Sequence, residues 1–100
     1  MNYEQFKKTK SYAIFSDYMQ LMTGMFFLDP ENKGMTFSEL EKKFDGDLTR
    51  DQISMGTDMG HDRGEIQEEN QFRGDWSVHT YILSPCMRRS LELAVELMSK

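Results

Sequence analysis

Apolar residues recur at three- and four-residue steps through the first part of the chain, which is the period of one face of an α-helix. The pattern predicts a central helix from Ser11 to about Leu28. We expect Asp29-Pro30 to end it in a turn, because the residue before a proline disfavours helical backbone. The predicted stripe consists of Phe15, Tyr18, Met19, Met22, Met25 and Phe26, widened by Ile14 and Leu21.

Two helix starts with the same signature follow. Thr36 precedes Glu39 by three residues, and Thr49 precedes Gln52 by three. In such a capping box, the threonine hydroxyl accepts a hydrogen bond from the third backbone N–H of the helix, and the Glu or Gln side chain accepts one from the threonine N–H. The signatures predict a helix-turn-helix, with the first helix, the turn and the second helix at about residues 37–44, 45–47 and 50–62.

Glycines lie within and just after the second helix of this pair. Ile53, Gly60 and either Gly56 or Thr57 fall on its buried face at helical spacing. An interior glycine costs a helix roughly 1 kcal/mol relative to alanine. The two glycines therefore indicate a close approach of another backbone, a bent helix, or a weak one. Gly64 fits the left-handed position that ends a helix.

A hairpin and a last helix complete the pattern. We expect a short strand around Ile66, a polar tip, and a return strand rich in Trp, Val, Thr, Tyr and Ile, at residues 65–69, 70–75 and 76–83. Which face of the return strand is buried stays open. Ser84-Pro85 is a typical helix start. The apolar stripe of the last helix comprises Met87, Leu91, Ala94, Val95 and Met98, flanked by Leu93 and Leu97.

This order of elements predicts one α+β domain over residues 1–100, with three helices, a β-hairpin wing and a C-terminal helix. Its parts are an N-terminal helical region, the helix-turn-helix with the wing, and the C-terminal helix, at residues 1–28, 35–83 and 84–100.

The order resembles the winged helix-turn-helix regulators of the MarR, PadR and ArsR type. The segments that carry the likeness are Leu48-Thr49-Arg50-Asp51-Gln52-Ile53, Asp62-Arg63-Gly64-Glu65-Ile66 and Tyr81-Ile82-Leu83-Ser84-Pro85. The resemblance implies a DNA-binding transcriptional regulator whose third helix lies near the major groove and whose wing lies near the backbone of duplex DNA. The contacts that it implies are Arg50, Ser54 and His61 on that helix, Arg73 on the wing, and Lys42 and Lys43 near phosphates.

Both ends of the chain carry apolar residues beside the helix-turn-helix. In regulators of this shape such ends pair across a two-fold axis, so the resemblance implies a homodimer. The alternative is that they close the core of a single protomer. The residues expected at the dimer interface are Tyr3, Phe6, Leu91, Val95 and Met98.

The charge pattern favours a different kind of partner. The chain has a formal net charge of −5, and residues 29–75 alone hold thirteen acidic against six basic residues, a net −7. Proteins that bind nucleic acids usually show the opposite balance, since their affinity depends on neutralised phosphates. The alternative function is therefore an acidic winged helix that binds a protein partner and no DNA, with a small DNA mimic as a third possibility.

No other chemistry is indicated. Cys86 is the only cysteine, which excludes an intrachain disulfide and favours a reducing, cytoplasmic compartment. No stretch approaches the roughly 18 apolar residues of a membrane helix, and the start of the chain lacks a signal-peptide pattern. We expect no enzyme, cofactor or metal site. The side chains that could bind a metal are His61, Asp62, His79 and Cys86, but their spacing matches no metal-binding motif. The acidic cluster of Glu65, Glu68 and Glu69 is the only candidate for catalysis, and a run of charges is usually a solvated face.

Overall fold

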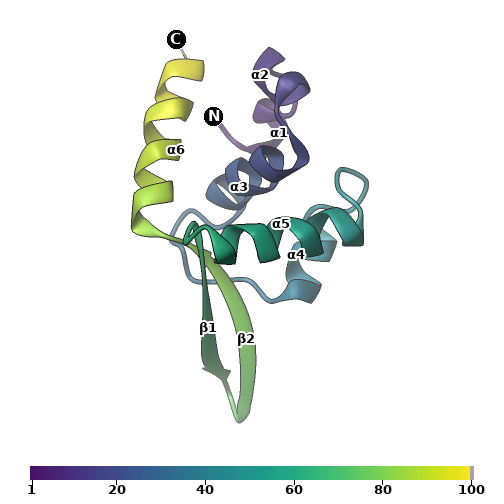
Figure 1. The fold of residues 1–100 in the computed structure, drawn as a ribbon, viewed down its shortest axis with the longest axis vertical. Coiled ribbons are helices and arrows are strands. Elements are labelled where there is room, and N and C mark those ends of the chain that lie inside the picture. Colours follow the sequence, from purple (N-terminus) through teal and green to yellow (C-terminus); the bar gives the residue numbers. More distant parts are fainter. Residues whose placement is uncertain (100) are drawn as a thin grey trace.

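The structure is a computed structural model that describes residues 1–99 (Figure 1). The helices gather at one end of the molecule, and a β-hairpin projects from the other end, which gives overall extents of 44 × 26 × 25 Å. The elements are α1 (Tyr3–Phe6), α2 (Lys10–Ile14), α3 (Asp17–Leu28), α4 (Phe37–Lys43), α5 (Arg50–Asp62), β1 (Ile66–Arg73), β2 (Trp76–Leu83) and α6 (Pro85–Met98).

Helix α3 lies at the centre, as the periodicity predicted. Residues 21–25 of α3 are all buried, and α3 contacts α1, α5, α6 and β2. Phe6 of α1 is fully buried and packs its ring against Tyr12, Phe15 and Phe27. The N-terminal residues are therefore part of the same core as the helix-turn-helix.

The prediction of one continuous helix from Ser11 to Leu28 is wrong. Phe15 has extended backbone angles (φ −68°, ψ 142°), and Ser16 begins α3 as an N-cap that accepts a hydrogen bond from the Met19 N–H at 3.2 Å. This break turns Ile14 away from the core, so its side chain is 83% exposed instead of widening the apolar stripe.

Both predicted capping boxes are confirmed. The Thr36 N–H donates to Glu39 Oε1 at 2.9 Å, and the Thr49 N–H donates to Gln52 Oε1 at 2.8 Å. In each box the threonine hydroxyl accepts from the backbone N–H three residues on. Because this signature is local in sequence, the starts of α4 and α5 fall where the sequence predicted them.

The hairpin is longer than predicted. Strands β1 and β2 pair antiparallel from Ile66↔Leu83 to Arg73↔Trp76, so the turn consists only of Gly74 and Asp75. Gly74 has φ 67°, the left-handed conformation that a two-residue hairpin turn requires. The predicted turn at residues 70–75 is longer than the observed one. Polar residues indicated a turn there, but they also fit a strand that is exposed to water on both faces.

The arrangement is an α+β domain, and it is compatible with a winged-helix layout. Helices α4 and α5, joined by a short turn, are at the place of the predicted helix-turn-helix, and the hairpin follows α5 (Figure 1). Met35, in the loop before α4, forms an isolated antiparallel bridge with Tyr81 of β2, with the Tyr81 N–H donating to the Met35 carbonyl at 2.8 Å. Among residues 1–99, no helix is both long and apolar enough to cross a membrane.

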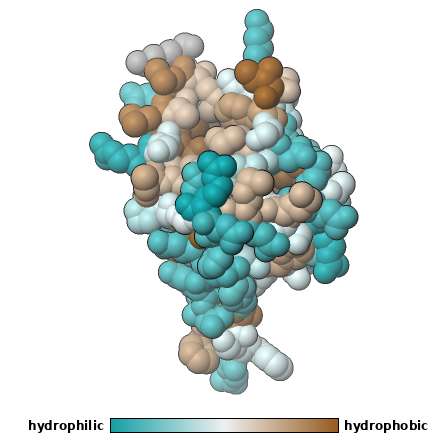
Figure 2. Space-filling view, viewed as in Figure 1, coloured by the Kyte–Doolittle hydropathy of each residue, from teal (hydrophilic) through white to brown (hydrophobic). Residues whose placement is uncertain are grey.

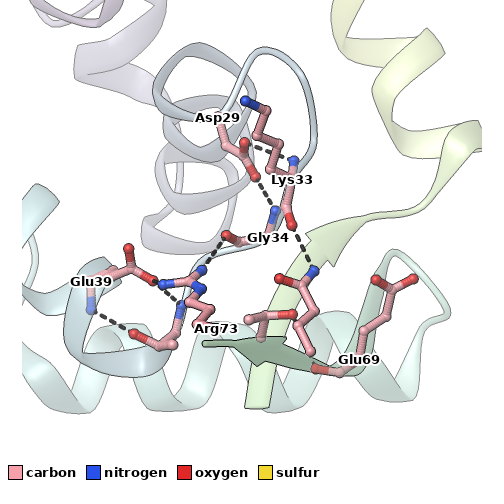
Figure 3. Close-up of polar contacts among 9 residues, drawn as sticks. Asp29, Lys33, Gly34, Glu39, Glu69 and Arg73 are labelled. Atoms are coloured by element: carbon pink, nitrogen blue, oxygen red, sulfur yellow. Dashed lines mark hydrogen bonds and ion pairs between the residues drawn. The ribbon is translucent and has the colours of Figure 1, made fainter. Parts of the chain in front are cut away.

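The hairpin is braced against the loop between α3 and α4 (Figure 3). The Asp29 carboxylate fixes that loop by accepting from the Lys33 and Gly34 N–H groups at 2.9 and 2.8 Å. The side-chain amide of Gln71 in β1 donates to the Lys33 carbonyl at 2.6 Å. A Cβ at Gly34 would lie 2.9 Å from the Gln71 amide nitrogen, so this close approach depends on glycine.

Arg73 completes the brace at the end of β1 (Figure 3). Its Nη1 donates to Glu39 Oε1 at 2.6 Å, and its Nη2 donates to the Gly34 carbonyl at 3.1 Å. The hydrogen bond from the Thr36 backbone N–H and the neighbouring Arg73 guanidinium together hold the pKa of Glu39 below its ordinary value. The carboxylate of Glu39 thus caps α4 and holds the hairpin at once.

Replacing Glu39 with glutamine should destabilise the fold at neutral pH but not in acid. Because the folded-state pKa of Glu39 is depressed, its charge stabilises the fold above the ordinary pKa of 4.5, and this contribution disappears as the pH falls through the folded-state value. Glutamine can still accept the hydrogen bond from the Thr36 N–H, but it loses the charge that strengthens this bond and faces Arg73. We expect a loss below about 1 kcal/mol, since the pair is partly exposed. Urea unfolding of the variant and the wild type at pH 7 and pH 2.5 measures this loss of stability. An equal loss at both pH values would contradict a role for the charge.

Candidate functional site

The exposed face of α5 is dominated by carboxylates. Successive residues of a helix are rotated by about 100°, and the buried side of α5 is formed by Ile53, Gly56, Thr57 and Gly60, as the sequence predicted. The glycines permit close packing rather than a bend: a Cβ at Gly60 would lie 2.7 Å from the Ile66 side chain. The residues at the centre of the opposite, exposed side are Asp51, Met55, Asp58 and Asp62.

The DNA contacts expected on α5 lie along one edge of this face. The Arg50 guanidinium is 5.7 Å from the centroid of the Phe37 ring, so it already stacks within the protomer. His61 Nδ1 is 3.4 Å from Glu68 Oε2 on β1. Ser54 is half-buried. The structure thus brings the three residues together, but it places them beside the acidic centre and not at it.

The remaining expected DNA contacts are not on the exposed face of α5. Arg73 is directed back toward Glu39 and the loop before α4, and the hairpin tip beyond it consists of Gly74 and Asp75. Arg73 therefore does not extend freely from the tip of the hairpin. Lys42 and Lys43 are exposed at the end of α4 and precede a turn that holds two aspartates.

The hairpin adds further acidic groups next to α5. The Glu68 carboxylate lies between two imidazoles, with His61 and His79 nitrogens each 3.4 Å from one of its oxygens. His79 Nδ1 also lies 3.1 Å from Asn70 Oδ1. Within residues 1–99, no three His, Cys, Asp or Glu side chains are placed to hold a metal ion. In Figure 2, hydrophilic residues cover most of the hairpin on the side in view.

Two methionines form an apolar ridge beside these acids. Met55 and Met59 are one turn apart on α5, and they are 68% and 42% exposed. They border a cavity of about 260 Å³ between α5 and the start of α3. We call this the α3–α5 groove, and its lining residues are Ser16, Asp17, Tyr18, Gln52, Met55, Gly56 and Met59. The sequence alone assigns no role to either methionine, because the groove beside them is formed by two separate helices.

The wall of the α3–α5 groove is held by polar contacts across elements. Gln52 Nε2 of α5 donates to Asp17 Oδ2 of α3 at 2.9 Å. The Tyr18 hydroxyl donates to the Glu65 carboxylate, and Arg63 pairs with the same carboxylate at 3.0 Å. Burial, and then the bond to Glu65, raise the pKa of Tyr18. The phenol therefore stays neutral across the physiological range.

Two aromatic side chains are exposed at the hairpin tip. Phe72 is 82% exposed and Trp76 is 76% exposed. The strand register places Phe72 opposite Ser77 and Trp76 opposite Arg73, so the two rings emerge from opposite faces of the hairpin. They do not form one continuous patch.

The residues expected at a dimer interface are mostly used within the protomer. Tyr3, Phe6 and Leu91 are buried in the core, and Val95 and Met98 are half-buried. Tyr3, Phe6 and Leu91 thus have little surface left for a second subunit, whereas Val95 and Met98 keep part of theirs. The homodimer stays a prediction. The exposed apolar residues of α6 are instead the two flanking ones, Leu93 and Leu97, at 55% and 70%.

Tyr3 illustrates how firmly the N-terminus is held. Its hydroxyl donates to Asp47 Oδ2 at 2.9 Å, and Lys7 pairs with the same oxygen at 3.1 Å. Burial, followed by the bond to Asp47, raises the pKa of Tyr3. Asp47 lies in the turn between α4 and α5, so α1 is anchored to the helix-turn-helix.

No family model, curated protein or solved structure matches this chain.

Proposed function

We propose that this chain is a protein-interaction module of winged-helix type that presents the exposed face of α5 to a basic protein partner. The observation that carries the proposal is the group of three carboxylates, Asp51, Asp58 and Asp62, at the centre of that face. In a winged helix this face is the one available for insertion into a groove. Its charge repels phosphates and attracts lysine and arginine side chains.

The neighbouring basic groups do not offset this charge. Arg73 is paired with Glu39, and Arg63 is paired with Glu65. Arg50 lies at the edge of the face, over the Phe37 ring. A partner that approaches α5 along its exposed centre therefore meets net negative charge.

The proposal is tested with two labelled probes, a fifteen-lysine peptide and a random-sequence DNA duplex, by fluorescence anisotropy across a salt series. We expect the peptide to bind at low salt and to be released as salt rises, because surface charges are screened. We expect the duplex not to bind in the same buffers. Binding of the duplex with a steep salt dependence, and none of the peptide, would overturn the proposal.

The second candidate function is a DNA-binding transcriptional regulator that acts as a dimer. The specific observation in its favour is that Arg50, Ser54 and His61 lie along one edge of α5, in an element order compatible with a winged helix. In this case α5 would meet DNA by that edge, with Lys42 and Lys43 near the phosphates. Arg50→Ala would then weaken duplex binding, whereas Arg73→Ala would act mainly through the hairpin brace.

A further inference from the structure

We infer that the α3–α5 groove binds an amphipathic helix of the partner. This helix carries apolar side chains on one face and lysine or arginine on both sides of that face. The inference rests on the proposed function and adds to it the place and the shape of the bound element. It follows from three observations on the groove: its apolar ridge, its size and the position of its carboxylates.

The apolar ridge is suited to bind a helix. Met55 and Met59 are one turn apart and project from α5 beside the cavity. Methionine side chains are unbranched and polarizable, so they adapt to apolar surfaces of different shape. A helix that docks on another helix presents apolar residues three or four apart, which is the spacing of this ridge.

The size of the cavity indicates that it binds a single side chain of the partner and not a small molecule. At about 260 Å³ it is smaller than the 300–1,000 Å³ typical of drug-sized ligand sites. Its lining includes Gly56 of α5 beside the two methionines. One large apolar side chain of a docked helix would occupy this space, between Tyr18 and the two methionines.

Carboxylates flank the ridge on both sides. Asp58 and Asp62 lie on one side of Met55 and Met59 around the helix, as expected from a rotation of about 100° per residue. Asp17 of α3 lies on the other side, held by the Gln52 amide at 2.9 Å. An apolar strip between two acidic margins is complementary to a helix whose apolar strip lies between two basic margins.

The test uses an 18-residue helical peptide of lysine and leucine with the leucines on one face, and a shuffled peptide of the same composition. Both are titrated into the full chain at physiological salt. We expect the amphipathic peptide to bind at least about tenfold more tightly, since only it presents a continuous apolar strip. The double variant Met55→Ser, Met59→Ser should lose most of that advantage and bind the fifteen-lysine peptide as the wild type does.

Trp76→Ser is the matched control variant. It removes an apolar side chain that is about as exposed as Met55 but lies at the hairpin tip. We expect no change in binding of the amphipathic peptide. Circular dichroism checks that each variant folds. We expect both to fold, because the side chains of Met55, Met59 and Trp76 are all exposed.

The outcomes separate this inference from the proposed function. If both peptides bind equally well and the methionine variant changes nothing, the groove is not the site, although charge-driven binding by α5 stands. If Trp76→Ser lowers affinity as much as the methionine variant does, the inference is overturned in favour of the hairpin tip. If no cationic peptide binds even at low salt, the proposed function itself fails.

Discussion

Replacing Gly24 with alanine is expected to destabilise the fold by about 2 kcal/mol. A Cβ at this position would lie 2.3 and 2.6 Å from two ring carbons of Phe44, and 3.2 Å from the Tyr3 ring. Overpacking a core costs typically 1–3 kcal/mol, and the upper part of that range applies because an aromatic ring cannot bend away. The helix propensity of alanine offsets up to about 1 kcal/mol.

The surroundings of Phe44 leave its ring no room to move. The ring is fully buried, and it packs edge-on against Tyr3 with centroids 5.6 Å apart. Tyr3 is in turn fixed by its bond to Asp47. Gly24 therefore sets the distance between α3 and the end of α4, and so the placement of the helix-turn-helix on the core.

Gly56→Ala is the control, because it makes the same change in a helix with a different neighbour. The added Cβ would lie 2.4 Å from a terminal methyl of Leu21, and every other atom within reach is at least 3.7 Å away. The end of a leucine side chain can move by changing its rotamer, so we expect a smaller loss of stability or none. Chemical denaturation of both variants measures the two losses of stability. Equal losses would show that the contact with the Phe44 ring adds no cost of its own at Gly24.

A double-mutant cycle attributes the effect to the ring. In a Phe44→Leu background, Gly24→Ala should lower the free energy of unfolding by less than it does in the wild type. The reason is that leucine leaves space where the ring carbons of Phe44 were. The coupling between the two substitutions is expected to be of the order of 1 kcal/mol, as for residues in direct contact.

The sequence predicted those features of the fold that short segments determine. The capping boxes at Thr36 and Thr49, the left-handed Gly64 and the Ser84-Pro85 start each depend on a few neighbouring residues, and all are confirmed. The acidic centre of α5 was also visible in the sequence, because helical spacing alone defines which side chains share a face.

Features that depend on distant partners were not predictable in this way. Phe15 continues the helical period of α3, yet it packs on Phe6 and ends α2. Arg73 is predicted to contact DNA from the wing, but in the structure it pairs with Glu39, which is 34 residues away in sequence. The α3–α5 groove likewise combines residues of two helices, and no pattern within either helix indicates it.

Replacing Asp51, Asp58 and Asp62 together with asparagine should lower the affinity for the fifteen-lysine peptide by about tenfold to a hundredfold. Each exposed ion pair contributes up to about 1 kcal/mol at low salt, and 1.4 kcal/mol corresponds to a factor of ten. Asparagine preserves side-chain size and polarity, so the fold should be unaffected. The salt dependence of peptide binding should become shallower as well.

The control for this variant separates the face of α5 from the net charge of the protein. Glu92→Gln with Glu96→Gln removes two exposed charges from α6, away from α5, and should leave peptide affinity nearly unchanged. An equal loss in both variants would mean that total charge, and not this face, attracts the peptide. Duplex DNA alone would not discriminate, because removing carboxylates favours its binding whichever function is correct. The lysine peptide is decisive, since only an acidic recognition surface on α5 makes its affinity depend on these three aspartates.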